Sequence, residues 1–375
     1  MGAYALWGRL LSWRSRWPIR SGASRHSAIG FSILEGAINL VQLRIDGPRP
    51  VVSAAALIEV ERHIEDLLEQ PALLKQMLAP ELKHGFVGRK IVSCLPPEHF
   101  RLLYINYKAA GASSVGDAIL QQVKGRLEGP LENFVLDYLP IRSQSAGDEQ
   151  LALVAVAERS VVIDFLEHFR RAGLCVDALE IAPVAINRLL ASVAAPDNHH
   201  NSIAISLGRY KSSLAVFSGR RLILDREVML GERDMVQQLC RSLDMEEAFA
   251  RRMLGQQLTP STDNEASYAT GLPETVGQIL KPLFLKLSQE IEKATLYTAS
   301  QTRGEPIREV FLLGAAGQWP VAKKVLQDIV HLPVQVLSPV STYQPLGEFL
   351  GVPPELAQQC LPLSCGLALR GMSHE

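Results

Sequence analysis

Few residues in this chain have the types and spacing that catalysis or metal binding requires. His199 and His200 are adjacent, but no third ligand stands near them in the sequence, so they do not predict a zinc site. Cys360 and Cys365 could share a metal, yet the apolar residues 361–363 between them favour packing. The sequence contains no G-x-S-x-G, Walker A or H-E-x-x-H motif. We therefore predict no catalytic residue and no metal ligand, and we expect a protein that is not an enzyme.

The overall composition narrows the class of partner. The chain has 375 residues, of which 47% are hydrophobic, and a formal net charge of −1. This balance gives no general attraction to nucleic acid, so we predict no nucleic-acid partner. The five cysteines are odd in number and form no C-x-x-C pair, which favours reduced thiols in a cytoplasmic protein. Acidic pairs such as Glu246-Glu247 are typical of solvated helix faces.

The first 27 residues are basic and contain three tryptophans, and no acidic residue precedes Glu35. Two interpretations remain open. The segment is a disordered basic leader or follows from a start codon placed too far upstream, or it is an amphipathic anchor whose tryptophans enter the lipid interface while its arginines meet anionic lipid. No apolar run is long enough to span a bilayer. The residues assigned to membrane contact are Arg9, Trp13, Arg14, Arg16, Trp17 and Arg20.

Three short runs rich in β-branched residues occur twice in the chain, and each set predicts a three-stranded meander. Each meander leads into segments with helical periodicity. The duplication predicts two lobes, residues 28–200 and residues 201–371, each built on a mixed sheet flanked by helices. The runs are 28–33, 38–45 and 51–60 in the first copy, and 202–207, 212–217 and 222–229 in the second.

A change of pattern marks residues 90–141 within the first lobe. A strand over 90–95 is followed by an alternating run, a helix and a second strand, which predicts a small inserted α+β subdomain. A polar stretch follows, and the chain resumes with a buried strand over 151–157. In the second lobe, residues 256–275 are rich in Ser, Thr, Asn, Gln and Pro, which predicts a mobile surface loop.

Two meanders with crossover strands, and a late strand that runs into glycines and a helix, are the organisation of the actin-like nucleotide-binding fold. This is an α/β fold of the ASKHA, or ribonuclease H-like, class. The order of segments resembles the PilM family of type IV pilus assembly proteins and is also similar to the mannose-sensitive pilus (MSHA) biogenesis protein MshI. The resemblance is carried by residues 29–43, 132–138, 152–173, 179–183, 206–208, 242–248, 289–291 and 366–371.

The resemblance implies three phosphate-binding turns, and all three are weakened here. Relatives carry an acidic residue and a lysine in the first turn, where this chain has Ser32 and Asn39. Ser206 stands where the second turn usually has an acidic residue, and the third turn, usually three glycines, reads G-A-A-G. We therefore expect no cofactor and weak or absent ATP binding; the alternative is an actin-like ATPase with a functional nucleotide cleft. The residues of this degenerate nucleotide site are Gly30, Ser32, Gly36, Asn39, Gly208, Lys211, Ser212, Gly314 and Gly317.

The resemblance also implies a partner. A PilM-like protein would be a cytoplasmic scaffold, peripheral at the cytoplasmic face of the inner membrane, that holds the cytoplasmic N-terminal peptide of a PilN-like single-pass membrane protein. The inserted subdomain could offer this peptide a sheet edge or groove. The alternative is that its apolar residues only form the core of the insert. The candidate partner-binding residues are Leu102, Tyr104, Phe134, Leu136 and Tyr138.

Overall fold

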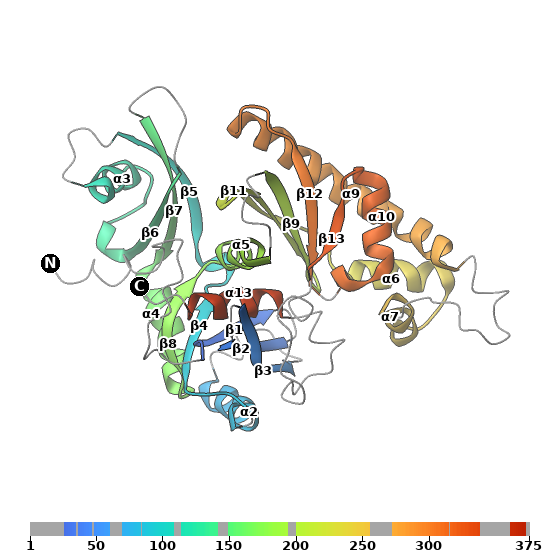
Figure 1. The fold of residues 1–375 in the computed structure, drawn as a ribbon, viewed down its shortest axis with the longest axis horizontal. Coiled ribbons are helices and arrows are strands. Elements are labelled where there is room, and N and C mark those ends of the chain that lie inside the picture. Colours follow the sequence, from blue (N-terminus) through green and yellow to red (C-terminus); the bar gives the residue numbers. More distant parts are fainter. Residues whose placement is uncertain are drawn as a thin grey trace.

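Three β-sheets organise the part of the chain that the structure describes (Figure 1). The computed structural model describes residues 26–34, 37–46, 49–60, 70–83, 85–108, 114–141, 149–193, 200–255, 272–314, 316–337 and 361–372. Two of the sheets have five strands in equivalent order, and the third has three strands. Within the described residues, no helix has both the length and the apolar character needed to cross a membrane.

The first sheet combines an antiparallel meander with two parallel strands. The runs of β-branched residues form β1 (Ile29–Leu34), β2 (Ala37–Asp46) and β3 (Arg49–Glu59), which confirms the first predicted meander. On the other side of β1 lie two parallel strands, β4 (Lys90–Cys94) and then β8 (Cys175–Glu180). The strand order is β3-β2-β1-β4-β8.

The second sheet repeats this arrangement. The second predicted meander is confirmed as β9 (Asn201–Leu207), β10 (Ser212–Ser218) and β11 (Arg221–Val228). Two parallel strands, β12 (Ile307–Leu313) and β13 (Val334–Val336), extend it on the β9 side. The order β11-β10-β9-β12-β13 therefore matches that of the first sheet strand for strand.

The third sheet belongs to the insert, and it differs from the predicted limits of 90–141. Its order is β5-β7-β6, formed by β5 (Arg101–Lys108), β6 (Phe134–Ile141) and β7 (Glu149–Glu158), with α3 (Val115–Lys124) on one face. The strand over 90–95 was assigned to the insert, but it pairs with β1 as β4. The strand over 151–157 was placed outside the insert, but as β7 it is the central strand of the inserted sheet.

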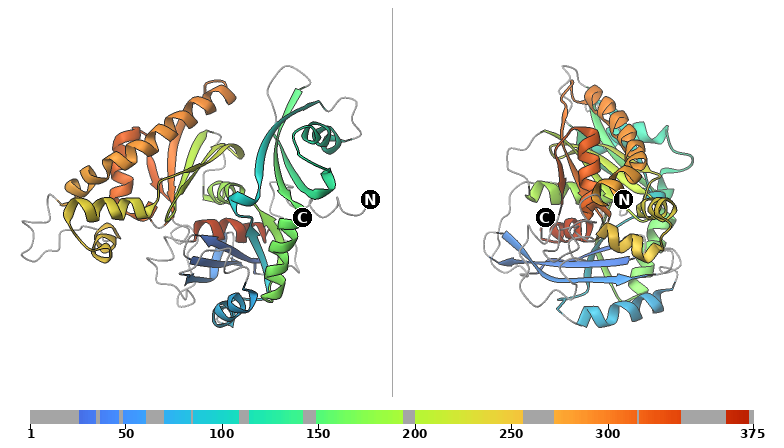
Figure 2. Two further views of the ribbon diagram at one scale, coloured as in Figure 1. Left: turned by 180° about the vertical axis from the view of Figure 1, so that it is seen from behind. Right: turned by 90° about the vertical axis from the view of Figure 1, so that its right-hand side faces the viewer.

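Among the described helices, two lie between the five-stranded sheets (Figures 1 and 2). These are α5 (Ala182–Val193) and the C-terminal α13 (Pro362–Arg370), which pack against each other. Their apolar residues share one core cluster with side chains from all three sheets. The outer face of the first sheet is covered by α2 (Pro71–Lys83) and α4 (Arg159–Arg171). The two central helices therefore link the lobes.

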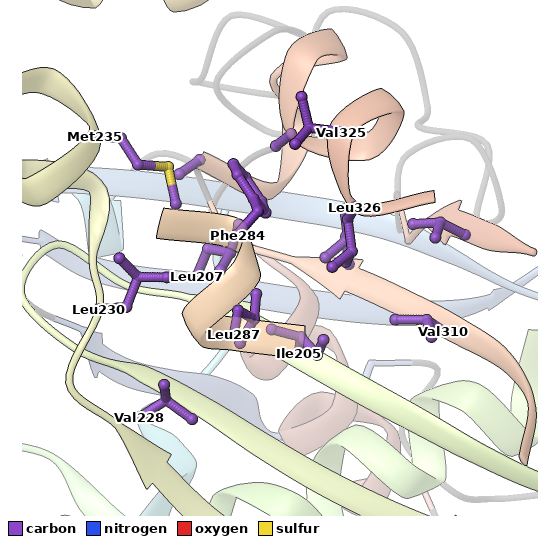
Figure 3. Close-up of a cluster of buried hydrophobic side chains, with 14 of the residues drawn as sticks. Ile205, Leu207, Val228, Leu230, Met235, Phe284, Leu287, Val310, Val325 and Leu326 are labelled. Carbon is purple, nitrogen blue, oxygen red and sulfur yellow. The ribbon is translucent and has the colours of Figure 1, made fainter. Parts of the chain in front are cut away.

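The second sheet carries its own helical layer. It consists of α6 (Glu232–Leu243), α7 (Glu247–Gly255), α9 (Leu272–Gln301) and α10 (Pro320–Val330). Figure 3 shows Phe284 and Leu287 of α9 meeting Ile205 and Leu207 of β9 in a buried cluster. Helix α9 begins inside the segment 256–275 that was predicted as a loop; residues 256–271 lie outside the described residues.

Candidate functional site

A pocket lies where the inner face of the inserted sheet meets the ends of β4 and β8. Residues of the inserted sheet and of the first five-stranded sheet line it. They are up to 86 positions apart in the sequence, from Leu95 to Ile181. Its walls are apolar except for two carboxylates. The lining residues are Leu95, Phe100, Val135, Asp137, Ala155, Val156, Ala157, Leu179, Glu180 and Ile181.

The two-residue period of β6 decides which side chains reach this pocket. Successive side chains of a strand point to opposite faces of the sheet. Val135 and Asp137 therefore line the pocket, while Phe134, Leu136 and Tyr138 pack on the other face in the core beneath α3. The inserted helix covers the more apolar face of β6, and the face that carries Asp137 remains for the pocket.

Small side chains on β7 keep the pocket open. Ala155 stands beside Asp137 in the antiparallel register, and Ala157 stands beside Val135. An alanine extends no further than its Cβ atom, so the central strand leaves space between the larger residues at the pocket's edges. The resulting apolar surface suits an apolar side chain or an extended segment of another chain.

Glu180 lines the pocket and is held by two arginines. Its side chain is 0% exposed. Arg188 of α5 donates two hydrogen bonds to it, from Nη1 to Oε2 at 2.7 Å and from Nη2 to Oε1 at 2.6 Å. Arg370 of α13 donates from Nη1 to Oε1 at 2.7 Å. Because a buried carboxylate needs compensating charge, this triad fixes both central helices to the end of β8.

Asp137 has a different environment. It is 8% exposed, and its Oδ1 accepts a hydrogen bond from the Tyr138 backbone N–H at 2.8 Å. Its Oδ2 is buried and has no hydrogen-bond partner among the described residues. Burial raises the pKa of Asp137 to about 7; the Tyr138 N–H and Arg370 oppose this shift and Glu180 adds to it. Oδ2 of Asp137 is thus an acceptor at the pocket for which the described residues supply no donor.

None of the five predicted partner-binding residues lines this pocket. Phe134, Leu136 and Tyr138 lie in the insert's own core, the alternative that the sequence left open. Leu102 and Tyr104 lie on the inner face of β5 and pack against the central core cluster. The Tyr104 hydroxyl donates to the Ile223 carbonyl of β11 at 2.6 Å, which joins the insert to the second sheet.

The first of the three predicted phosphate-binding turns lies under α13. Gly30 packs so closely that an added Cβ would stand 1.9 Å from the Ser364 carbonyl oxygen. The Ser32 and Ser364 hydroxyls are 2.8 Å apart and hydrogen-bonded, and Ser364 also donates to the Asn39 carbonyl at 3.0 Å. The side-chain carboxamide of Asn39 is buried, and neither its Nδ2 nor its Oδ1 makes a hydrogen bond with the described residues. Gly36 lies outside the described residues.

The other two turns are also occupied by internal contacts. In the second, the Gly208 carbonyl accepts from the Glu232 N–H at 2.8 Å, Lys211 forms an ion pair with Glu227 at 2.5 Å, and Ser212 donates to the Leu230 carbonyl at 2.5 Å. In the third, Gly314 has a φ of 83° and its carbonyl accepts from the Gly317 N–H at 3.1 Å.

These contacts test the fit of Mg-ATP to the three turns. The Ser32 and Ser212 hydroxyls are committed to protein groups, and the Lys211 ammonium is neutralised by a carboxylate. A Mg-nucleotide needs free hydroxyls, backbone N–H groups and positive charge facing the phosphates. The described residues of these turns do not fit that requirement.

The remaining candidate ligands do not assemble a metal site in the described part of the chain, which holds no group of three metal-binding side chains. His200 contacts Glu309 with 2.5 Å between Nε2 and Oε1. Cys365 is buried in α13, and burial raises the pKa of its thiol. His199, Cys360 and the six residues assigned to membrane contact lie outside the described residues.

Comparison with known proteins identifies both a family and a fold. The family model for the type IV pilus assembly protein PilM matches residues 127–372. A solved structure described as a PilM-PilN type IV pilus biogenesis complex is similar with a TM-score of 0.72 and 20% identity, covering 94% of this chain and 100% of that chain. The ethanolamine utilization protein EutJ from Carboxydothermus hydrogenoformans is similar with a TM-score of 0.52 and 13% identity, covering 92% and 90%. No curated protein sequence matches. The fold is the actin-like α/β fold.

Proposed function

The chain belongs to the PilM family of type IV pilus assembly proteins, and we propose that it is a non-catalytic scaffold that binds the cytoplasmic N-terminal peptide of a PilN-like membrane protein. The observation that carries this proposal is the apolar pocket between the inserted sheet and the end of the first sheet. The similar solved structure is a complex of a PilM with a PilN, which supports the choice of partner.

Strand order supports an extended peptide as the ligand. β6 is the last strand of the third sheet, and β8 is the last strand of the first sheet among the described strands. An edge strand offers backbone N–H and C=O groups that a peptide can pair with, while adjacent pockets select its side chains. Both edges border the pocket, so backbone pairing and side-chain burial are available to one bound segment.

Isothermal titration of the full chain tests this proposal. The probe is a synthetic peptide with the cytoplasmic N-terminal sequence of the PilN-like protein from the same organism. We expect saturable 1:1 binding, and we expect Ala155→Trp to abolish it because the indole fills the pocket. The matched control is Ala72→Trp, at an exposed position of α2. Absence of wild-type binding, or equal binding by a folded Ala155→Trp variant, would contradict the proposal.

The nucleotide site belongs to the same proposal: we propose that it is degenerate and that the protein hydrolyses no ATP. The internal contacts of Ser32, Lys211 and Ser212 support this. Titration of a fluorescent ATP analogue with Mg²⁺ is the test, and we expect no saturation. A dissociation constant in the low micromolar range would instead favour the alternative function, an actin-like ATPase.

Attachment to the cytoplasmic face of the inner membrane completes the proposed function. The arginines and tryptophans of residues 1–27 support it, because basic residues near anionic lipid contribute about 1 kcal/mol each. We expect the full chain to sediment with phosphatidylserine vesicles at low salt and to be released at high salt. Equal sedimentation of a variant lacking residues 1–26 would exclude this role of the segment.

A further inference from the structure

We propose that Asp137 determines which peptide the pocket accepts, by taking a hydrogen bond from an uncharged side-chain donor of the bound peptide, either a carboxamide or a hydroxyl. The inference rests on the proposed function, because it names the chemistry by which the same pocket recognises its partner. It adds a polar requirement to a site whose other walls, apart from Glu180, are apolar.

The geometry of the two carboxylates carries this inference. Both line the pocket, but Glu180 has its two oxygens occupied by Arg188 and Arg370. Asp137 Oδ2 is buried and makes no hydrogen bond with any described residue. A buried acceptor without a partner is unfavourable, and a ligand that supplies the donor relieves it. An apolar peptide of similar shape cannot do so, which makes this atom a source of selectivity.

The surrounding charges favour a neutral donor over a lysine or arginine. With Asp137 ionised, two carboxylates face two guanidinium groups, those of Arg188 and Arg370. The charge of the buried cluster is then balanced. A cation from the peptide would leave one uncompensated positive charge close to Arg370, where little solvent screens it. An uncharged donor satisfies Oδ2 without disturbing this balance.

Proton linkage gives the inference a distinctive signature. The pKa of Asp137 is raised to about 7 in the free protein, and a donor to Oδ2 favours the ionised carboxylate. The peptide should therefore bind more tightly as the pH rises from 6 to 8. The charged groups that face Asp137 are Glu180 from β8 and Arg370 from α13, with Arg188 of α5 bound to Glu180. From α4, Arg159 bonds the carbonyls of Glu132 and Phe134 at the start of β6.

The test is isothermal titration of the same PilN-like peptide at pH 6, 7 and 8. We expect wild-type affinity to increase about 5- to 10-fold over this range. Asp137→Leu, which keeps the size of the side chain and removes the acceptor, should bind at least 10-fold more weakly than wild type at pH 8 and lose the pH dependence. Asp137→Asn should keep an acceptor oxygen and lose only the pH dependence. Thermal melting establishes that each variant is folded.

A second measurement does not depend on either variant. Each polar residue of the peptide is replaced in turn by an apolar residue of similar size and titrated against the wild-type protein; one replacement should abolish the pH dependence. If the wild-type protein binds no peptide, the proposed function fails. If it binds and Ala155→Trp blocks binding, but affinity is independent of pH and of Asp137→Leu, the function stands and this inference is overturned. Tighter binding of a peptide with lysine as the donor would also overturn it.

Discussion

At the scale of single residues, Glu180 shows how a buried charge can hold distant segments together. Arg188 follows it by eight residues and Arg370 by 190, and both hydrogen-bond its carboxylate. Arg188 also donates to the Gly366 carbonyl of α13 at 3.0 Å. The two arginine side chains are only 17% and 15% exposed, so removal of the carboxylate leaves two poorly solvated cations.

The first prediction follows from that imbalance. Glu180→Leu should lower the free energy of unfolding by about 3–5 kcal/mol, the range seen when one partner of a buried ion pair is removed. Urea denaturation followed by circular dichroism measures it. The control is Glu167→Leu in α4, where Glu167 pairs with Arg170 and Arg171 on the solvent-exposed surface, and we expect no measurable change. Similar effects of the two substitutions would contradict the role assigned to Glu180.

The second prediction concerns pH and Asp137. The unfolded aspartate has a pKa near 3.9 and the folded one about 7, so the folded protein keeps a proton that the unfolded chain loses. The stabilisation from this proton is complete below about pH 4 and is lost as the pH rises through 7. Relative to Asp137→Asn, the wild-type protein should therefore lose about 1.4 kcal/mol per pH unit between pH 4 and 7. Parallel stability curves for the two proteins would contradict the buried environment of this carboxyl.

Residue-level features were only partly predictable from the sequence. The alternation in β6 indicates two faces, and Phe134, Leu136 and Tyr138 were chosen because they are apolar. The structure places α3 over that face, and the sequence does not say which face a helix will cover. Asp137 is the residue from which the pocket-facing side of this strand could have been inferred, because it is the charged residue in the otherwise apolar run 134–139. Glu180 and Arg370 are 190 residues apart in the sequence, so their pairing leaves no local pattern.

At the scale of elements, close approach of α13 to its neighbours depends on glycine. A Cβ atom at Gly366 would stand 2.2 Å from the Ala185 carbonyl oxygen of α5. No side-chain movement can relieve this contact because the atom belongs to the backbone. The absence of a side chain at Gly366 therefore allows the two central helices to pack at their present distance.

The third prediction tests this crossing. Gly366→Ala should destabilise the protein by about 1–3 kcal/mol or more, because the helices must separate to admit the methyl group. The matched control is Gly255→Ala at the end of α7, where a Cβ would meet nothing within 4 Å. There we expect no loss, since alanine is the better helix former. Thermal and urea denaturation of both variants measure the difference, and equal stability would show that α5 and α13 tolerate a wider spacing.

The elements themselves were more predictable than their partners. Both meanders followed from short β-branched runs and turn residues, which are local signals. The limits of the insert did not, because β4 and β7 are both apolar strands and only long-range pairing assigns them to a sheet. β4 joins β1 in parallel, whereas β7 joins β5 and β6.

At the scale of the whole molecule, the insert contacts the second lobe as well as the first. Tyr104 of β5 donates its hydroxyl to the Ile223 carbonyl of β11 at 2.6 Å. Burial raises the pKa of Tyr104, so the hydroxyl keeps its proton and remains a donor. The two five-stranded sheets are linked through α5 and α13, and this hydrogen bond adds a separate link near the insert. This contact was not predicted, because no sequence pattern places β5 beside β11.

The last prediction uses that hydrogen bond. Tyr104→Phe removes the link while keeping the ring, and should cost about 0.5–1.5 kcal/mol of stability. Its distinctive effect should be local: faster amide hydrogen exchange in β5 and β11, because the insert can then move relative to the second lobe. The control is Tyr107→Phe, whose hydroxyl bonds Gln150 within the inserted sheet at 2.8 Å. That variant should leave exchange in β11 unchanged, since its lost bond does not cross between lobes. If both variants alter β11 equally, the effect comes from loosening of the insert itself, and Tyr104 does not couple the two parts of the molecule.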